Sequence, residues 1–193
     1  MSASAAPHSE TSDTARLLLV SGSLRARSTS TAALRTAQQV APESVVATLY
    51  DGLAALPHFN QDDDRDPLPS EVAELRGAVH AADAVLFSTP EYAGALPGSF
   101  KNLLDWLIGD AEPRSIYEKP VAWINVSPRG APNAHAELRT VLGFAHATIV
   151  ESACVHVPIT DAVIDADGTV VDRDGRTRIA DAMATLARWA RAG

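Results

Sequence analysis

Apolar residues along the chain fall into two alternating patterns. Short continuous apolar runs, which are typical of buried strands, occupy residues 17–20, 45–49, 84–87, 121–126 and 148–157. Between them, apolar residues recur every three or four positions. This spacing predicts helices from Ser28 or Thr29 to a point before Pro42, and around 72–82, 100–107, 138–145 and 179–190. Strands and helices that alternate through a whole chain predict a parallel sheet with helices on both faces.

Five strand and helix units in 193 residues fit a compact doubly wound order better than a six-stranded dinucleotide-binding fold. We therefore predict a flavodoxin-like α/β fold, with a five-stranded parallel sheet in a three-layer α/β/α arrangement. Residues 1–14 are expected to form a flexible tail, and residues 15–193 a single domain. The turn signals Asp167-Gly168 and Asp174-Gly175 predict a small surface hairpin between residues 158 and 175.

Composition narrows the classes of partner. A formal net charge of −8 and a pI near 5.1 argue against binding to nucleic acid or to an anionic membrane surface, although a local basic loop can still hold one phosphate. The single cysteine, Cys154, excludes an internal disulfide and lies in an apolar run typical of a small buried side chain. No run approaches the roughly 20 apolar residues that span a bilayer, and the start carries no signal-like stretch. We expect a cytoplasmic protein.

The segment from Ser21 to Ser30 follows the first predicted strand and leads into a helix. A helix N-terminus offers free amides to an anion, and arginine can grip phosphate oxygens with two parallel donors. The segment adds hydroxyl groups and one such guanidinium, on Ser23, Arg25, Ser28 and Ser30. The glycine patterns of dinucleotide-binding and triphosphate-binding loops are absent. The segment thus predicts a site for a single phosphate, with a plain turn rich in capping residues as the alternative.

A second loop follows the third predicted strand, from Thr89 to Gly98. Its prolines stiffen the chain and its glycines allow tight turns, so its backbone amides can border a flat heteroaromatic ring. The alternative is a rigid loop in which Tyr92 only covers the helix. A third loop, from Ser127 to Pro132, follows the fourth strand and is expected at the same edge of the sheet.

The first two loops carry motifs that resemble those of the NAD(P)H-dependent FMN reductase family, which includes quinone, chromate and azo-dye reductases. The motifs are Gly22-Ser23-Leu24-Arg25-x-x-Ser28, Pro90-Glu91-Tyr92 and the segment from Pro97 to Trp106, and the resemblance runs from about Arg16 to the C-terminus. It implies that Ser23, Arg25, Ser28 and Ser30 bind the FMN phosphate. It also implies that Pro90, Glu91, Tyr92 and Ala93 border the isoalloxazine ring, with Ser127, Arg129 and Gly130 on its far side. Two residues depart from the family pattern, because Ser30 and Ala93 stand where asparagine is usual.

The resemblance implies an enzyme that passes hydride from NADPH or NADH to flavin N5, and then to a quinone or a similar small acceptor. The cofactor performs that chemistry itself, so we assign no catalytic acid or base, and the histidine spacing predicts no metal site. One alternative is a flavodoxin-like FMN electron carrier that does not oxidise nicotinamides. Another, a phosphorelay receiver, needs acidic residues where this chain has Ser21-Gly22-Ser23. Trp106 lies off the apolar stripe of its helix, which together with the resemblance predicts a homodimer or homotetramer.

Overall fold

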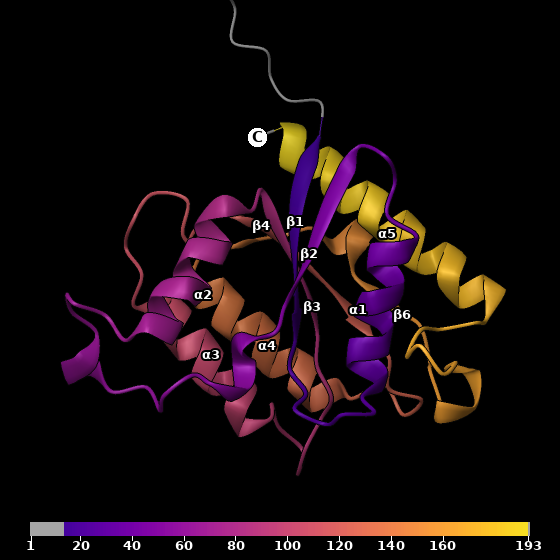
Figure 1. The fold of residues 1–193 in the computed structure, drawn as a ribbon, viewed down its shortest axis with the longest axis horizontal. Coiled ribbons are helices and arrows are strands. Elements are labelled where there is room, and N and C mark those ends of the chain that lie inside the picture. Colours follow the sequence, from indigo (N-terminus) through magenta and orange to yellow (C-terminus); the bar gives the residue numbers. More distant parts are fainter. Residues whose placement is uncertain (1–13, 193) are drawn as a thin grey trace, which may run out of the picture.

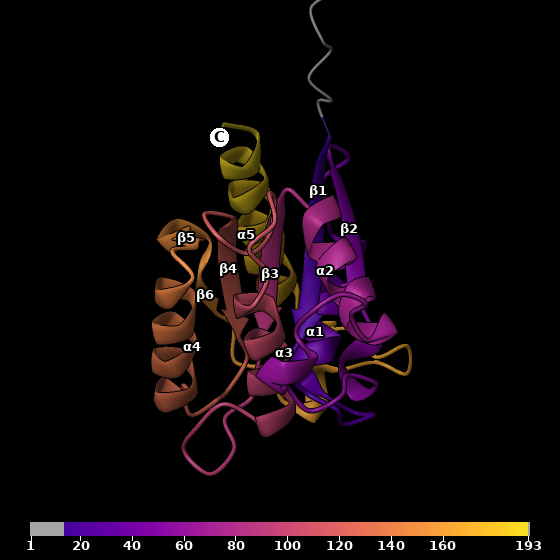
Figure 2. The same cartoon turned by 90° about the vertical axis from the view of Figure 1, so that its left-hand side faces the viewer.

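The fold is an open sheet in which every strand pair is parallel. The computed structural model describes residues 14–192, so the predicted N-terminal tail, apart from Thr14, lies outside the described residues. The strands are β1 (Ala15–Ser21), β2 (Val45–Tyr50), β3 (Ala84–Ser88), β4 (Pro120–Asn125), β5 (Thr148–Ile149) and β6 (Val155–His156). Their order is β2-β1-β3-β4-β5, with β6 also paired to β4 (Figure 2). This is the flavodoxin-like order, so the predicted fold class is confirmed.

Five helices form the outer layers (Figure 1). They are α1 (Thr29–Gln39), α2 (Ser70–Ala81), α3 (Gly98–Ile108), α4 (Pro132–Phe144) and α5 (Arg173–Ala192). Helices α1 and α5 cover one face of the sheet, and α2, α3 and α4 cover the other. Alternation along β1 shows why both faces are apolar, because Leu17 and Leu19 pack toward α1 and α5 while Leu18 and Val20 pack toward the opposite helices.

The last predicted strand, 148–157, is wrong as a continuous element. A 3₁₀ turn at Glu151–Ala153 separates β5 from β6, and both short strands pair with β4. The turn places Ala153 in the core beneath α5, whereas Glu151 stays exposed and pairs with Arg139. Burial raises the pKa of the adjacent Cys154 thiol to about 11. This cysteine is therefore a protonated, packed side chain.

A short hairpin does form between residues 158 and 175. Ile164 and Val170 make an antiparallel bridge, and Gly168 adopts a φ of 75° in the turn between them. The backbone N–H of Val170 donates to Thr36 Oγ1 at 2.8 Å, which fastens the hairpin to α1.

Trp106 is fully buried, so the sequence-based expectation of an exposed interface aromatic is wrong. The loop after β2 folds over this part of α3. The indole Nε1 donates to the Pro57 carbonyl at 2.9 Å, and Phe59 packs edge-on against the ring at 5.0 Å between centroids. The side chain thus fastens a loop to the domain. Within residues 14–192, no helix is both long and apolar enough to cross a membrane.

Candidate flavin site

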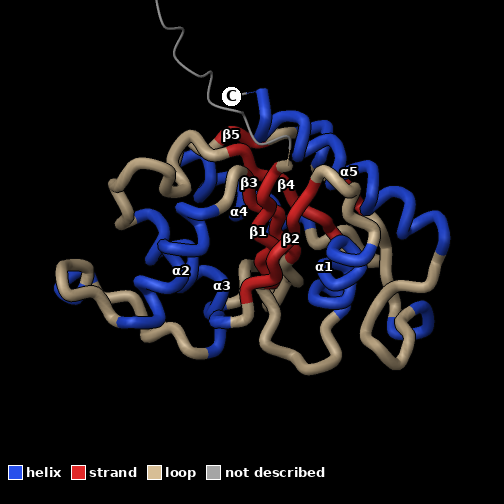
Figure 3. Tube along the Cα trace, turned by 45° about the horizontal axis from the view of Figure 1, so that its top comes forward, coloured by secondary structure: helices blue, strands red, loops and turns tan. Residues whose placement is uncertain are grey.

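Three loops meet at the carboxyl edge of the sheet, which is the lower edge of Figure 1; Figure 3 shows the strands in the middle and the connecting loops beyond their ends. They follow β1, β3 and β4. Gly22 joins the first two, because its N–H donates to Ser88 O at 2.8 Å. A Cβ at this position would lie 2.4 Å from Thr89 Oγ1 and 2.8 Å from the Phe100 ring. Only glycine permits this close approach.

The first loop is organised by its own hydroxyl groups. Ser28 is the N-cap of α1, where its Oγ accepts from Thr31 N at 3.2 Å. Ser21 Oγ and Thr31 Oγ1 lie 2.9 Å apart, and Ser23 Oγ accepts from Arg25 N at 3.3 Å. These bonds fix the path of the loop without using the side chain of Arg25.

The donors at the mouth of this loop are unengaged within the described chain. The first-turn amides of Thr29 and Ser30 have no acceptor there, and the Arg25 guanidinium is exposed and has no partner. The Ser30 hydroxyl is fully enclosed and also lacks a hydrogen-bond partner. A phosphate monoester is the group whose oxygens match such donors, so the residues present fit the phosphate end of FMN.

The second loop turns tightly around Ala93 and Gly94. Tyr92 N donates to Ala95 O at 3.0 Å and Ala95 N donates to Tyr92 O at 3.1 Å. Ala93 has a φ of 51° and Gly94 a φ of 76°. Asparagine tolerates this left-handed conformation better than alanine, so the alanine at position 93 is held in it by the surrounding turn. The Tyr92 side chain is 76% exposed and stands free at the tip.

Glu91 has a structural role that sequence analysis missed. Its Oε2 accepts from the N–H groups of Asn133 at 2.8 Å and Ala134 at 3.0 Å. Helix α4 needs this acceptor, because its N-cap residue is Ala131, which has a φ of 43° and no capping side chain. A second hydrogen bond joins the loop to α4, because Glu137 Oε2 accepts from Leu96 N at 2.6 Å. The second loop is therefore held on α4 at both ends.

The third loop forms a turn around Ser127 and Gly130. Asn125 organises it, since its Oδ1 accepts from Ser127 N at 3.0 Å and its Nδ2 donates to Gly130 O. Ser127 Oγ accepts from Arg129 N at 3.3 Å, and Gly130 adopts a φ of 86°. The sequence pattern predicted Ser127, Arg129 and Gly130 as site residues but not Asn125. A polar residue at the very end of a strand was the signal that could have indicated its role in the turn.

A fourth segment reaches the same edge. Asn102, near the start of α3, donates to Pro57 O at 2.8 Å and accepts from Phe59 N at 2.7 Å. This pair of bonds holds the segment from Pro57 to Phe59 against α3. Sequence analysis recognised Asn102 only as part of a motif, and its contact with a loop 45 residues away was not visible there.

Arginines without partners concentrate at this edge. Among the described residues, the guanidiniums that lack any hydrogen bond or ion pair are those of Arg25, Arg27, Arg35, Arg65, Arg129 and Arg173. Three of them, Arg25, Arg27 and Arg129, lie on the first and third loops. In a chain with a net charge of −8, these three groups make the edge locally attractive to an anion.

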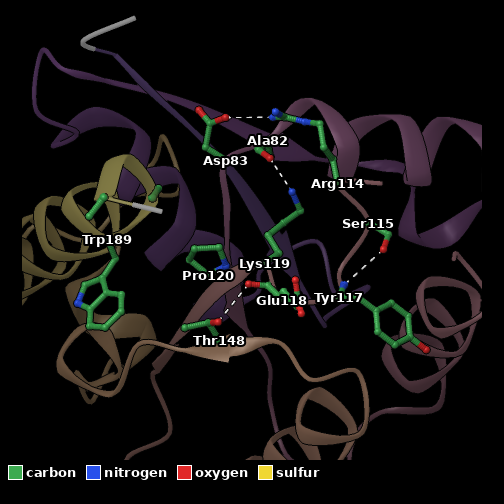
Figure 4. A pocket seen from close by; sticks show the side chains of 12 residues that line it. Ala82, Asp83, Arg114, Ser115, Tyr117, Glu118, Lys119, Pro120, Thr148 and Trp189 are labelled. Carbon is green, nitrogen blue, oxygen red and sulfur yellow. Dashed lines mark hydrogen bonds and ion pairs between the residues drawn. The ribbon is translucent and has the colours of Figure 1, made fainter. Parts of the chain in front are cut away.

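A cavity of about 450 Å³ lies at the opposite edge, between the start of β4 and the end of α5 (Figure 4). Two cationic side chains of this cavity bind backbone carbonyls at the end of α2. Lys119 Nζ donates to Ala82 O and Arg114 Nε donates to His80 O, both at 2.8 Å. Burial, together with the nearby Arg114, lowers the pKa of Lys119 to about 8. This cavity lies at the other end of the strands from the three loops. Within residues 14–192, no cluster of side chains is arranged to hold a metal ion.

Comparison with known proteins agrees with this geometry. Residues 15–162 match the protein family described as NADPH-dependent FMN reductase. The chain is 32% identical to an NAD(P)H-dependent FMN reductase of Pseudomonas aeruginosa, covering 93% of this chain and 97% of that protein. It is 29% identical to a 2-hydroxy-1,4-benzoquinone reductase of a Burkholderia species, covering 91% and 96%.

The solved structure of FerB, a flavoenzyme NAD(P)H:(acceptor) oxidoreductase from Paracoccus denitrificans, superimposes with a TM-score of 0.79 at 28% identity. The match covers 91% of this chain and 97% of FerB. These matches confirm the predicted oxidoreductase class and its cofactors, FMN and NAD(P)H. The chain belongs to the NADPH-dependent FMN reductase family.

Proposed function

We propose that this protein binds FMN at the carboxyl edge of the sheet, oxidises NADPH or NADH, and reduces a quinone or a similar small acceptor. The observation that carries the proposal is the first loop, which carries two free helix amides and an unpartnered guanidinium and is joined to the second loop through Gly22. When bound, FMN supplies hydride acceptance and donation at N5. The protein's part is to hold and orient the rings.

Each loop has a distinct task in this proposal. Ser23, Arg25, Ser28 and Ser30 hold the phosphate, with the amides of Thr29 and Ser30 as the main donors. The segment Pro90, Glu91, Tyr92 and Ala93 borders the ring, and its attachment to α4 keeps its amides in fixed directions. Ser127, Arg129 and Gly130 close the far side. The exposed ring of Tyr92 lies where a nicotinamide or an acceptor approaches.

A quinone acceptor is supported by the relatives, which include a probable NADPH:quinone oxidoreductase of rice at 29% identity as well as the benzoquinone reductase. Small planar acceptors suit a site in which one ring position is used first by the nicotinamide and then by the acceptor. We assign no side chain as general acid or base.

The assembly in this proposal is a homodimer or homotetramer in the cytoplasm, with no nucleic-acid or membrane partner, built from a single domain over residues 15–193. With Trp106 buried, support for self-association comes from exposed aromatics instead. Tyr92 is 76% exposed and Phe144, at the end of α4, is 71% exposed. Light scattering that gives a monomer with FMN bound would refute the oligomer.

Steady-state kinetics of the FMN-loaded protein test the function. Either NADH or NADPH should be oxidised with a quinone as acceptor, following ping-pong kinetics because nicotinamide and quinone occupy one ring position in turn. Tyr92→Ala should change the KM values of both substrates more than it changes FMN affinity. If neither nicotinamide reduces the flavin and only a protein partner does, the protein is an electron carrier instead.

A further inference from the structure

A second cavity lies directly beside the first loop. It has a volume of about 390 Å³ and opens between the start of α1 and the hairpin that follows β6. Its walls are Ala26, Arg27, Ser28, Ala32 and Arg35 on one side, and Asp161, Ile164 and the turn 165–168 on the other. Ser28 both caps α1 and lines this cavity. The cavity therefore continues outward from the place proposed for the FMN phosphate.

Its charged groups are mostly unengaged within the described chain. Arg27 and Arg35 on the helix side, and Asp161 and Asp167 on the hairpin side, have no hydrogen-bond or ion-pair partner for their side chains. Asp165 differs, because its carboxylate accepts from Thr169 N at 2.8 Å and Thr169 Oγ1 at 2.9 Å. Those bonds lower the pKa of Asp165. Two cations and two carboxylates thus face one space without satisfying each other.

The hairpin wall is held in place by neighbouring elements. Val170 O accepts from Arg176 at 3.0 Å, in addition to the bond from Val170 N to Thr36. The Gly168 backbone approaches Arg35 so closely that a Cβ would lie 2.7 Å from the guanidinium. The cavity is consequently preformed rather than assembled by a ligand.

We propose that this cavity binds the adenosine end of NADH. The inference rests on the function proposed above, in which a nicotinamide nucleotide meets the flavin. A guanidinium can bind a phosphate or stack on a purine, and a carboxylate can accept from the ribose hydroxyls. Ala26, Ala32 and Ile164 add the apolar surface that a base requires. The volume lies in the range of small-ligand sites.

The charges favour the unphosphorylated ribose. NADPH would bring a 2′-phosphate beside the three carboxylates of Asp161, Asp165 and Asp167. Two guanidiniums of the lining, Arg27 and Arg35, offset part of that repulsion, and the guanidinium of Arg176 acts on Asp165 from behind the hairpin. The 2′ and 3′ hydroxyls of NADH instead donate to carboxylates that have no other partner. NADH is therefore the preferred donor.

The test uses the FMN-loaded protein and two nucleotide fragments that lack nicotinamide. Calorimetry should show ADP-ribose binding at least tenfold more tightly than its 2′-phosphate derivative. Arg35→Gln should weaken ADP-ribose binding about tenfold, because a charge-assisted contact is lost, and leave FMN affinity unchanged. Asp167→Asn should reduce the difference in affinity between ADP-ribose and its 2′-phosphate derivative. Arg65→Gln, on an exposed and unpartnered arginine near α2, is the matched control and should change nothing.

Three results would overturn the inference. ADP-ribose binding that is equal in Arg35→Gln and the parent protein would exclude the site, and tighter binding of the 2′-phosphate derivative would exclude the preference for NADH. A loss of FMN affinity in Arg35→Gln, with ADP-ribose binding retained, would assign the cavity to the flavin instead. If NADH is oxidised while the variant binds ADP-ribose normally, only this inference fails. If the FMN-loaded protein oxidises no nicotinamide, the proposed function fails.

Discussion

Charged side chains at the two edges of the sheet differ in whether they have partners within the described chain. At the amino edge, Asp83 accepts from Arg16 and Arg114, while Lys119 and Arg114 cap carbonyls at the end of α2. Partial burial acts to raise the pKa of Asp83, but those hydrogen bonds outweigh it and lower that pKa. At the carboxyl edge, Arg25 and Arg129 have no partner in the described chain.

The difference distinguishes polar groups that stabilise the fold from polar groups that are available to a ligand. A satisfied cation at the amino edge stabilises the fold and has little left to offer a ligand, although the larger cavity lies there. Unsatisfied donors at the carboxyl edge contribute little to folding and are available to an anion. Cavity size and unsatisfied donors therefore point to opposite edges of the sheet.

The largest effect should come from closing the space around Gly22. Gly22→Ala forces a Cβ against Thr89 and Phe100, so we expect the free energy of unfolding to fall by about 1–3 kcal/mol and FMN affinity to fall with it. Chemical denaturation and FMN fluorescence quenching measure the two effects. Gly77→Ala is the control, because its Cβ meets nothing within 4 Å and alanine favours the helix. A stable Gly22→Ala protein with normal FMN binding would contradict this packing.

Arg25→Ala should weaken FMN binding without affecting folding. The lost charge-assisted hydrogen bonds are worth roughly 1.5–3 kcal/mol, or about tenfold or more in the dissociation constant. The free energy of unfolding of the apo protein should not change, because this exposed side chain makes no hydrogen bond or ion pair in the described chain. If FMN affinity survives this change but is abolished by Ser127→Ala, the phosphate binds at the third loop.

Glu91→Ala distinguishes the role of this carboxylate as the cap of α4 from its proposed role beside the flavin ring. Loss of the α4 cap should lower the free energy of unfolding of the apo protein by about 1 kcal/mol, measured by denaturation. Glu43→Ala, at an exposed glutamate without a partner, is the control. An unchanged apo stability combined with lost FMN affinity would show that Glu91 acts on the ring rather than on α4.

Sequence patterns predicted the architecture because it depends on local periodicity. Runs such as Leu17 to Val20 are apolar on both faces, as a strand between two helical layers must be. The broken strand at Glu151 and the burial of Trp106 escaped prediction, since both depend on contacts distant in sequence.

The candidate site was predictable in part for the same reason. Ser28 and Arg25 belong to a local strand-to-helix signal, and in the structure Ser28 caps α1 while the Arg25 guanidinium has no partner in the described chain. The bonds from Glu91 to α4 and from Asn102 to Phe59 join segments about 40 residues apart, so no local pattern reveals them. Which arginines lack partners is also a property of the folded chain alone.

The smallest expected effect is a pH dependence at the amino edge. Burial and Arg114 lower the pKa of Lys119 in the folded protein to about 8, whereas the unfolded lysine keeps its ordinary value of 10.5. Between these values the unfolded chain binds more protons, so this group makes the folded state more stable as pH rises from about 8. Below pH 8 both states are protonated and the burial penalty is fully present. Denaturation at pH 7.5 and pH 8.5 should show this rise, of less than about 1 kcal/mol, in the parent protein and a smaller one in Lys119→Met. FMN affinity should be unchanged in that variant, and a loss of FMN affinity would mean that the two edges are coupled rather than separate.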